Sequence, residues 1–316
     1  MKEIGGYIEL DTYTGKEYHE GAFALNCGRN ALVYLIRAKQ IKNLCLPYYC
    51  CCSIYDICKK ESVGVSYYYI DENLRPILIK ELEEKEWLYI INYYGQLNNK
   101  ELAEYKEQYQ RVIVDSAQAF FQPCVQGIDT IYSCRKFFGV ADGAYLYTDA
   151  KIISLERGYS YDKMRFLHGR FEKDANEFYS EYIENNKRFQ TEPLRLMSRL
   201  TQNLLRGLDY YKIAETRESN FKCLHNVLKT INRINLEIPY GAFTYPLYVR
   251  NGNLIREELR QKKIYIPLLW PNVCEMCKAS EFEYDFAMNL LPLPVDQRYG
   301  NDDMYYILDI LDELLL

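Results

Sequence analysis

The sequence contains no apolar run near the roughly twenty residues that a membrane-spanning helix needs, and its first residues lack the apolar core of a signal peptide. Its formal net charge is only -5 over 316 residues, with both signs mixed along the chain. This removes the basic surface expected of a dedicated nucleic-acid-binding protein. With 48% hydrophobic residues, the chain is long enough to bury a large core. We therefore expect a globular cytoplasmic protein with no membrane or nucleic-acid partner.

Metal-ligating patterns are also sparse, because only three histidines occur and they are scattered. The eleven cysteines are an odd number and fall in apolar segments such as 44–53, which indicates reduced thiols rather than a disulfide framework. Cys274 and Cys277 have the spacing of a metal or redox pair, but no second pair of this kind exists. We predict no metal site, and a redox or metal protein that uses Cys50 to Cys52 is an alternative.

The segment 21–149 alternates helix-like and strand-like patterns, which is typical of βα units on a largely parallel sheet. Two strands, 86–92 and 111–115, are continuous apolar runs that end in a polar residue, as expected for central strands buried on both faces. The predicted elements are helices at 31–40 and 53–60 and strands at 43–47, 64–70, 86–92 and 111–115.

The strand signal fades between residues 151 and 231, where 197–208 and 210–228 have helical patterns. After residue 234 the pattern changes to that of a small α+β domain, with apolar segments at 245–249 and 264–267 and helices at 253–261 and 301–315. We predict an α/β fold with a mostly parallel sheet, divided into a large domain, 1–232, and a small C-terminal domain, 233–316.

Ligands of such sheets gather at the carboxyl ends of the strands, where Asn92, Asp115 and the segment 133–136 would converge. Lys136 and Asp115 fit the needs of pyridoxal 5'-phosphate (PLP), because an amine must form a Schiff base with its aldehyde and a carboxylate must keep its pyridine nitrogen protonated. Phe137 and Phe138 follow Lys136 and predict its burial, which favours the nucleophilic amine. The alternative is a strand-end lysine whose ammonium group reaches water.

With these residues placed, the chain resembles the DegT/DnrJ-type aminotransferases, which are fold type I PLP enzymes with the aspartate-aminotransferase-like architecture. The resemblance extends from about Ala24 to the C-terminus. It depends on five segments in family order, each weak alone: 25–32, 46–49, 91–96, 115–118, and 133–136 with Asp142 and Gly143 behind.

The resemblance implies that Lys136 holds PLP, that Asp115 contacts the pyridine nitrogen, and that Gln118 reaches the phenolic oxygen. Both Asp115 and Gln118 have a structural alternative, as the N-cap and capping-box partner of a following helix. Ser133 has the spacing of a hydroxyl that helps hold the phosphate, although many family members place a serine where Ile131 stands.

The phosphate cradle would lie at Gly28, Arg29 and Asn30, just before a helix whose free amides and dipole suit a dianion. The family usually carries a small hydroxyl residue at Arg29 or Asn30, so the contact is expected from the Asn30 amide or from backbone alone. Without the resemblance, Gly28 is a routine helix-entry glycine.

The resemblance also places Cys51 where the family has an aromatic ring stacked on PLP. Its polarizable sulfur, or the ring of Tyr49 or Tyr48, would take that position. On the substrate side we predict contacts from Asn92 and from Arg298, which suits a carboxylate or phosphate unless it pairs with Asp296.

Asn185 and Asn186 fall near an asparagine that family members present to the neighbouring subunit, but a solvated helix end is the preferred interpretation. The resemblance implies an aminotransferase that moves an amino group from an amino-acid donor to a keto-sugar, linked to a nucleotide, or to a similar small carbonyl substrate, and that works as a homodimer. The alternatives are a PLP-dependent sugar dehydratase and a catalytically silent protein with this fold that serves as a binding or regulatory partner.

Overall fold

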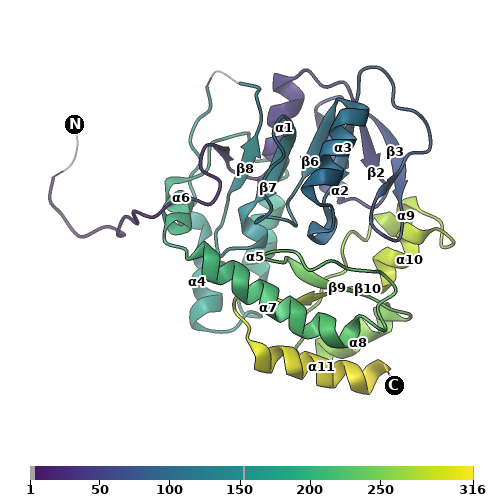
Figure 1. Cartoon of the computed structure of the whole chain (residues 1–316). Helices are drawn as coiled ribbons and strands as arrows, with labels where there is room; N and C mark the ends of the chain where they lie inside the picture. Colours follow the sequence, from purple (N-terminus) through teal and green to yellow (C-terminus); the bar gives the residue numbers. More distant parts are fainter. Residues whose placement is uncertain (1–3, 152–153, 316) are drawn as a thin grey trace.

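The computed structural model describes residues 4–151 and 154–315, which fold around two sheets. The large sheet has eight strands in the order β1-β8-β7-β6-β5-β2-β3-β4, and the small sheet contains β9 and β10. Figure 1 shows the large sheet above and the small sheet, with α7, α8 and α11, below it. The predicted α/β class with a mostly parallel sheet and a small C-terminal α+β part is confirmed.

The first half of the chain alternates strands and helices as its sequence pattern predicts. Two strands coincide with the predicted ranges at both ends, β2 (Asn43–Pro47) and β3 (Gly64–Ile70). The other elements are β1 (Phe23–Leu25), α1 (Gly28–Ala38), α2 (Cys52–Lys60), β4 (Pro76–Ile77), β5 (Glu86–Ile91), α3 (Asn99–Tyr109), β6 (Val112–Asp115), β7 (Asp129–Ser133) and β8 (Ala144–Tyr147), with 3₁₀ turns η1 (Tyr93–Gly95) and η2 (Cys134–Lys136).

Strands β3, β2, β5, β6 and β7 run parallel, so their carboxyl ends share one edge of the sheet. In this register Ile91 of β5 lies beside Asp115 of β6, which in turn lies beside Ile131 of β7. The turn η2, which ends at Lys136, leaves β7 at the same edge. The register therefore brings the Asp115 and Lys136 segments next to each other.

The two faces of β7 meet different parts of the molecule because successive side chains alternate across a strand. Ile131 packs in a large core cluster with Leu32 and other residues of α1. Tyr132 packs on the opposite face in an aromatic cluster that includes Phe137, Leu205 and Ala214. Helix α1 and helices α6 and α7 therefore cover opposite faces of this part of the sheet.

Residues 154–231 contain helices and no strand, as their pattern predicts. The helix α7 (Tyr210–Leu228) coincides with the predicted range, and α6 (Arg199–Arg206) is shorter than the predicted 197–208 because Ser198 caps its start. The remaining elements are η3 (Tyr161–Lys163), α4 (Arg165–Glu172) and α5 (Tyr179–Arg188).

The C-terminal part is built on the antiparallel pair β9 (Thr244–Tyr248) and β10 (Leu290–Pro294), with α8 (Gly252–Gln261), α9 (Val273–Met276), α10 (Phe282–Asn289) and α11 (Asn301–Leu315). The apolar segment 264–267 forms no strand, and its side chains Ile264 and Ile266 instead pack in the core cluster of the small sheet. Strand β10 was not predicted, since Pro292 and Pro294 lower the strand signal except at sheet edges.

The domain boundary at residues 232 and 233 stays a prediction. Helix α7 lies before it, yet Phe221, Leu224 and Leu228 of α7 pack in the same core cluster as Leu247 and Leu291 of the small sheet. Any division of the chain therefore has to account for a helix that joins both parts.

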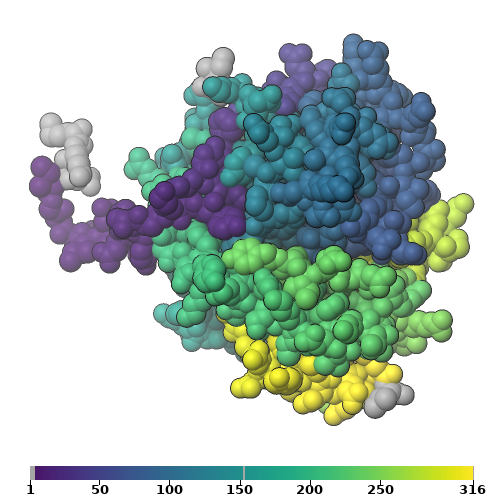
Figure 2. All heavy atoms as spheres, viewed as in Figure 1, coloured from purple at the N-terminus to yellow at the C-terminus, as the bar shows by residue number. Residues whose placement is uncertain are grey.

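The described chain from Ile4 to Leu10 projects from the body of the molecule, as Figures 1 and 2 show. Ile4, Tyr7 and Ile8 are each more than nine-tenths exposed, at 96, 97 and 94%. Farther along, a hydrogen bond from Tyr13 N to Asn203 Oδ1, at 2.9 Å, attaches the segment to α6. Within the described ranges, no helix is both long and apolar enough to cross a bilayer.

The burial of His19 against the face of β7 that carries Tyr132 can be tested by changing the pH. It is 3% exposed and lies 4.0 Å, centroid to centroid, from the ring of Tyr132, with Nε2 2.9 Å from the carbonyl oxygen of Phe120. Burial lowers the pKa of His19 from 6.5 to about 4. Between these values the unfolded chain binds more protons than the folded protein, so the free energy of unfolding should fall as the pH drops through this window.

We predict that lowering the pH from 7.5 to 4.5 costs the wild type about 2 to 3 kcal/mol more unfolding free energy than it costs His19→Gln, because glutamine does not titrate. Urea denaturation at both pH values measures this difference. Equal losses of unfolding free energy in the two proteins would contradict the lowered pKa of His19.

Candidate active site

Asp115 is a half-buried carboxylate at the end of β6 whose partners are all neutral. Its Oδ1 accepts a hydrogen bond from Ala117 N at 2.9 Å, and its Oδ2 accepts one from Tyr89 Oη at 2.8 Å. Asp115 forms no ion pair with any residue that the structure describes. No helix follows β6 directly, so neither Asp115 nor Gln118 acts as the N-cap or capping-box residue of the structural alternative.

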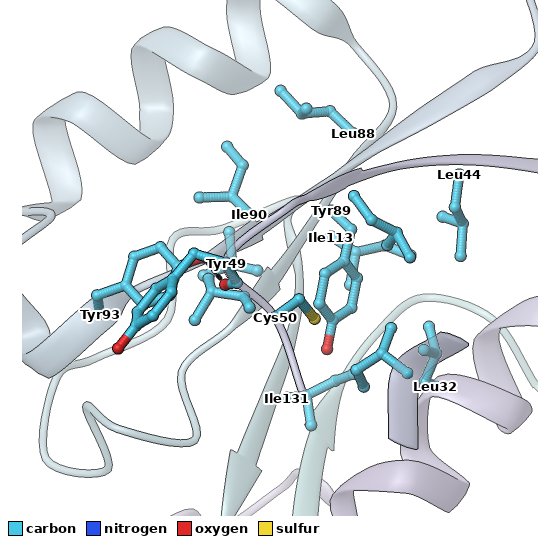
Figure 3. Close-up of a cluster of buried hydrophobic side chains, with 14 of the residues drawn as sticks. Leu32, Leu44, Tyr49, Cys50, Leu88, Tyr89, Ile90, Tyr93, Ile113 and Ile131 are labelled. Carbon is cyan, nitrogen blue, oxygen red and sulfur yellow. Dashed lines mark hydrogen bonds between the residues drawn. The ribbon is translucent and has the colours of Figure 1, made fainter. Parts of the chain in front are cut away.

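The Tyr89 phenol keeps the surroundings of Asp115 neutral. Burial first, and then the Asp115 charge, raises the pKa of Tyr89 far above its ordinary value, so the hydroxyl stays a donor. Figure 3 shows Tyr89, Cys50 and Ile131 close together near Leu32 of α1. Burial also raises the pKa of the Cys50 thiol. The Asp115 carboxylate is therefore the negative group of an otherwise neutral region.

A pair of arginines lies at the other side of this region, by the start of α1. Arg29 Nη1 donates to the backbone oxygen of Asn186 at 3.2 Å, and Arg135 Nη2 donates to the Asn186 side-chain oxygen. The Arg135 guanidinium lies 4.6 Å from the ring centroid of Phe189. The Nε of Arg135 is buried without a hydrogen-bond partner. Burial lowers the pKa of Arg135, and the nearby charge of Arg29 lowers it further.

The first turn of α1 contains no acidic residue, and the N-cap, Cys27, makes no side-chain capping bond. Neither Arg29 nor Arg135 pairs with a carboxylate among the described residues. Backbone amides at a helix start have no intrahelical acceptor and carry the positive end of the helix dipole. The two guanidinium groups and the free amides of α1 together form a candidate anion-binding site.

Asn30 does not supply the side-chain contact expected of it. Its Nδ2 donates to Asn26 Oδ1 at 3.0 Å and to the carbonyl oxygens of Glu192 and Pro193 at 3.3 and 3.0 Å. The amide group therefore fixes the segment before α6 instead of facing a ligand. Of the two expected sources of a phosphate contact at this position, only the backbone remains.

Ser133 and Ile131 share one face of β7, because they are two residues apart. Ile131 is buried and supplies no polar group, and a Cβ on Gly28 would lie 3.7 Å from Ile131 Cγ2. The Ser133 hydroxyl is half-buried and makes no hydrogen bond to the described residues. The start of α1 and the end of β7 are therefore in van der Waals proximity, with the Ser133 hydroxyl available.

Lys136 is exposed, and the predicted burial is wrong for the single chain. The turn η2 directs Phe137 and Phe138 into the aromatic cluster, while Lys136 Nζ lies 5.6 Å from the ring centroid of Phe243. Apolar neighbours in sequence did not predict burial, because a 3₁₀ turn sends successive side chains in different directions. The amine remains accessible at the carboxyl edge of the sheet.

Gln118 and Asn92 are both buried and hold the loop after β5. Gln118 Oε1 accepts from Tyr94 N at 2.9 Å, where Tyr94 has a positive φ of 54°. Asn92 Nδ2 donates to Leu97 O and Gln122 Oε1, and its Oδ1 accepts from Leu97 N. The predicted substrate contact from the Asn92 side chain does not fit, because its polar atoms are already paired. The Nε2 of Gln118 has no partner among the described residues.

The rings of the two tyrosines before α2, Tyr48 and Tyr49, pack against other aromatic rings. Tyr49 is fully buried, and its ring lies 4.7 Å from Trp270 and 5.0 Å from Phe286, centroid to centroid. Tyr48 stacks on Tyr67 at 4.9 Å. These contacts occupy the rings expected to stack on the cofactor.

Cys51 is half-buried beside the start of α2, and its sulfur accepts a hydrogen bond from Ser53 Oγ at 3.1 Å. Of the three side chains expected to stack on the cofactor ring, Cys51, Tyr49 and Tyr48, only Cys51 is left without an aromatic partner among the described residues. No group of three or more potential metal ligands gathers in the described part of the chain.

Arg298 pairs with Asp296 through Nε at 2.6 Å and Nη2 at 2.8 Å, which is the structural alternative predicted for it. Asn185 is buried, with Nδ2 donating to Ala141 O at 3.0 Å, so the predicted solvated helix end is wrong. Asn186, beside it, accepts hydrogen bonds from both arginines of its own chain.

Arg135, Arg217 and Gln297 were not predicted from the sequence. Arg135 carried a signal, because it directly precedes Lys136. Arg217 carried none, since its helical pattern looks like that of any amphipathic helix, yet its Nη2 donates to the carbonyl oxygen of Phe137 at 3.1 Å. Gln297 Nε2 donates to the same oxygen at 2.9 Å.

No protein-family model matches the sequence, and no curated protein matches it either. Solved structures do match over most of the chain. DesV from S. venezuelae has 15% sequence identity and a TM-score of 0.66, covering 93% of this chain and 84% of DesV. At this identity the similarity establishes the fold.

Two further structures support the same conclusion. Spr1654 from Streptococcus pneumoniae, described as a sugar aminotransferase and solved in its PLP form, has 14% identity and a TM-score of 0.61, covering 91% of this chain and 85% of Spr1654. A DegT DnrJ EryC1 StrS aminotransferase from Brucella abortus has 14% identity and a TM-score of 0.59, with coverage of 93% and 86%. The chain therefore has the fold type I architecture of the DegT/DnrJ/EryC1/StrS sugar aminotransferases.

Proposed function

We propose that this protein is a PLP-dependent aminotransferase. The carrying observation is a set of charges without partners among the described residues: the carboxylate of Asp115 lacks a cation, while Arg29 and Arg135 lack an anion. Buried or half-buried charges are costly unless a partner neutralises them. A ligand with a cationic nitrogen at one end and a phosphate dianion at the other complements both.

PLP has these two ends, and the residues present fit it. Asp115 would hold the protonated pyridine nitrogen with the lone pairs that Tyr89 and Ala117 leave free. Arg29, Arg135 and the first amides of α1 would hold the phosphate, since guanidinium groups match phosphate oxygens. The Ser133 hydroxyl, on the face of β7 that also carries Ile131, is available as a further contact.

Lys136 supplies the reactive amine. When bound, the cofactor serves as an electron sink that stabilises negative charge at the substrate's α-carbon. Lys136 Nζ would hold the aldehyde carbon of PLP and, once an amino donor displaces it, would carry the proton removed from that α-carbon as general base and acid. Its exposure at the edge of the sheet lets donor and acceptor reach it.

The proposed amino acceptor is a keto-sugar, linked to a nucleotide, or a similar small carbonyl compound, and the proposed donor is an amino acid. The similarity to Spr1654, described as a sugar aminotransferase, supports this choice of acceptor class. A protein with this fold that binds without catalysis is the second candidate, favoured by the commitment of Asn30 and Tyr49 to structural contacts.

We also propose a homodimer that uses the surface of α4 and α5. A hollow of about 690 Å³ on this surface is lined by both charge signs, among them Arg165, Lys187, Glu181 and Glu184. A surface with both signs can be complementary to its own copy across a two-fold axis. Exposed aromatic side chains extend the surface: Tyr159, Tyr161, Phe171, Tyr179 and Tyr182.

Lys136→Ala should abolish covalent attachment of PLP, because the turn after β7 brings the Lys136 amine to the sheet edge at which Asp115 lies. Borohydride reduction of the PLP-treated protein, digestion and mass spectrometry locate the modified lysine. Lys100→Ala, which removes an exposed lysine of α3, is the matched control and should keep the label on the peptide of Lys136. Labelling that spreads over surface lysines, with none preferred, would refute the proposed function.

Arg135→Met should weaken PLP binding by about tenfold or more, since a charge-assisted hydrogen bond contributes about 1.5 to 3 kcal/mol. Fluorescence titration in a Lys136→Ala background measures this without covalent attachment. Binding of pyridoxal, which lacks the phosphate, should change little, and Arg260→Met removes a charge on α8 as the control. Equal weakening for PLP and pyridoxal would remove Arg135 from the phosphate contact.

Phe171→Glu should shift the protein from dimer to monomer, because a buried charge without a partner opposes association. Sedimentation velocity measures the shift. The control is Tyr305→Glu, at an exposed aromatic residue of α11. A monomeric wild type, or a Phe171→Glu variant that remains dimeric, would contradict the proposed surface.

A further inference from the structure

Arg217 of α7 is a fully buried cation, 1% exposed, that contacts no carboxylate among the described residues. Burial lowers the pKa of Arg217 to about 10, and the carboxylate that offsets this effect, Asp296, is itself paired with Arg298. Burying a guanidinium group is costly unless hydrogen bonds satisfy it. The contacts that satisfy it here are therefore informative.

The guanidinium joins three segments that are distant in sequence. It donates from Nη2 to Phe137 O at 3.1 Å, from Nη1 to Ala242 O at 2.9 Å, and from Nε to Gln297 Oε1 at 2.7 Å. Gln297 Nε2 then donates to Phe137 O at 2.9 Å, so this carbonyl accepts from both side chains. The Arg217 guanidinium carbon also lies 4.7 Å from the ring centroid of Phe137.

These segments surround the amine of Lys136. Phe137 follows Lys136 directly, and Phe243, the ring that faces Lys136 Nζ at 5.6 Å, follows Ala242. One buried group therefore fixes both the backbone that carries the amine and the backbone of the ring against which the amine lies.

We propose that Arg217, with Gln297, is a positioning residue that sets where the Lys136 amine stands at the edge of the sheet. Arg217 does not touch the reacting atoms and acts through Phe137 and Phe243. The catalytic role of Lys136 rests on the proposed function, whereas the hydrogen bonds that Arg217 makes are present in the protein without cofactor.

A neighbouring residue separates this role from simple attachment of α7. Asn220, which is also 1% exposed, donates from Nδ2 to Val295 O, Asp296 O and Tyr299 O at 3.3, 3.4 and 2.9 Å. These bonds tie α7 to the segment that contains Gln297 and make none to Phe137. Asn220→Ala is therefore a matched control that loosens the same interface without freeing the turn of Lys136.

The experiment measures reductive methylation of the cofactor-free protein by formaldehyde and cyanoborohydride, with mass spectrometry of each lysine at several pH values. The rate at Lys136 is divided by the rate at Lys100, an exposed lysine of α3 in the same molecule. In the wild type the ratio should be below one, because the Phe243 ring lies against one side of the Lys136 amine and restricts the approach of formaldehyde. Arg217→Met and Gln297→Leu should raise the ratio toward one, whereas Asn220→Ala should not change it.

A second measurement follows the rate at which PLP becomes attached. The rate of attachment should fall by about tenfold or more in Arg217→Met, because a small displacement of a reacting group lowers the reaction rate strongly. In Asn220→Ala it should fall by less than about twofold. Arg217→Lys should restore only part of the rate, since an ammonium group cannot reach all three acceptors in one plane.

The outcomes separate the two ideas. If PLP does not attach to Lys136 in the wild type, the proposed function fails, and the methylation ratio still tests the positioning role. If Arg217→Met and Asn220→Ala change the ratio equally, Arg217 is a packing residue and the inference is overturned. Should Arg217→Met not fold, Gln297→Leu tests the same bond to Phe137 at a half-buried position.

Discussion

The parallel pairing of β5, β6 and β7 is the constraint on which the candidate site depends. It places the carboxyl ends of the three strands at one edge, so that Asp115 lies beside Ile131 and the turn to Lys136 begins a few residues farther on. The start of α1 at Gly28 also lies close to Ile131, where an added Cβ would be 3.7 Å from Ile131 Cγ2, so α1 borders the same edge. Chemistry-bearing groups from three segments meet because one hydrogen-bonding register aligns them.

Charge neutralisation gives this region its character. Asp115 accepts only from neutral donors, and Arg29 and Arg135 share Asn186 as a neutral acceptor. Elsewhere the structure also contains ion pairs between partly buried charges, such as the contact between Lys163 and Glu192. A ligand with a cation at one end and an anion at the other would neutralise these unpaired charges of both signs, and this is the basis of the proposed function.

The opposite face of β7 links this edge to the rest of the fold. Tyr132 and Phe137 pack in an aromatic cluster against α6 and α7, and Arg217 of α7 holds the Phe137 carbonyl. Helix α7 also contributes to the core of the small sheet. The turn that carries Lys136 is therefore held by the same helix that joins the two parts of the molecule.

The sequence by itself determined the elements with strong local patterns and the residues whose positions follow from strand ends. Strands β2 and β3 and helix α7 were predicted to their end residues, and Asp115 and Lys136 were placed at one edge, because periodicity and parallel topology are encoded locally.

Only the tertiary structure decided that Lys136 is exposed and that Asn30 is already bonded, since hydrogen-bond partners such as Pro193 come from distant segments. The same reason kept Arg217 hidden from sequence analysis.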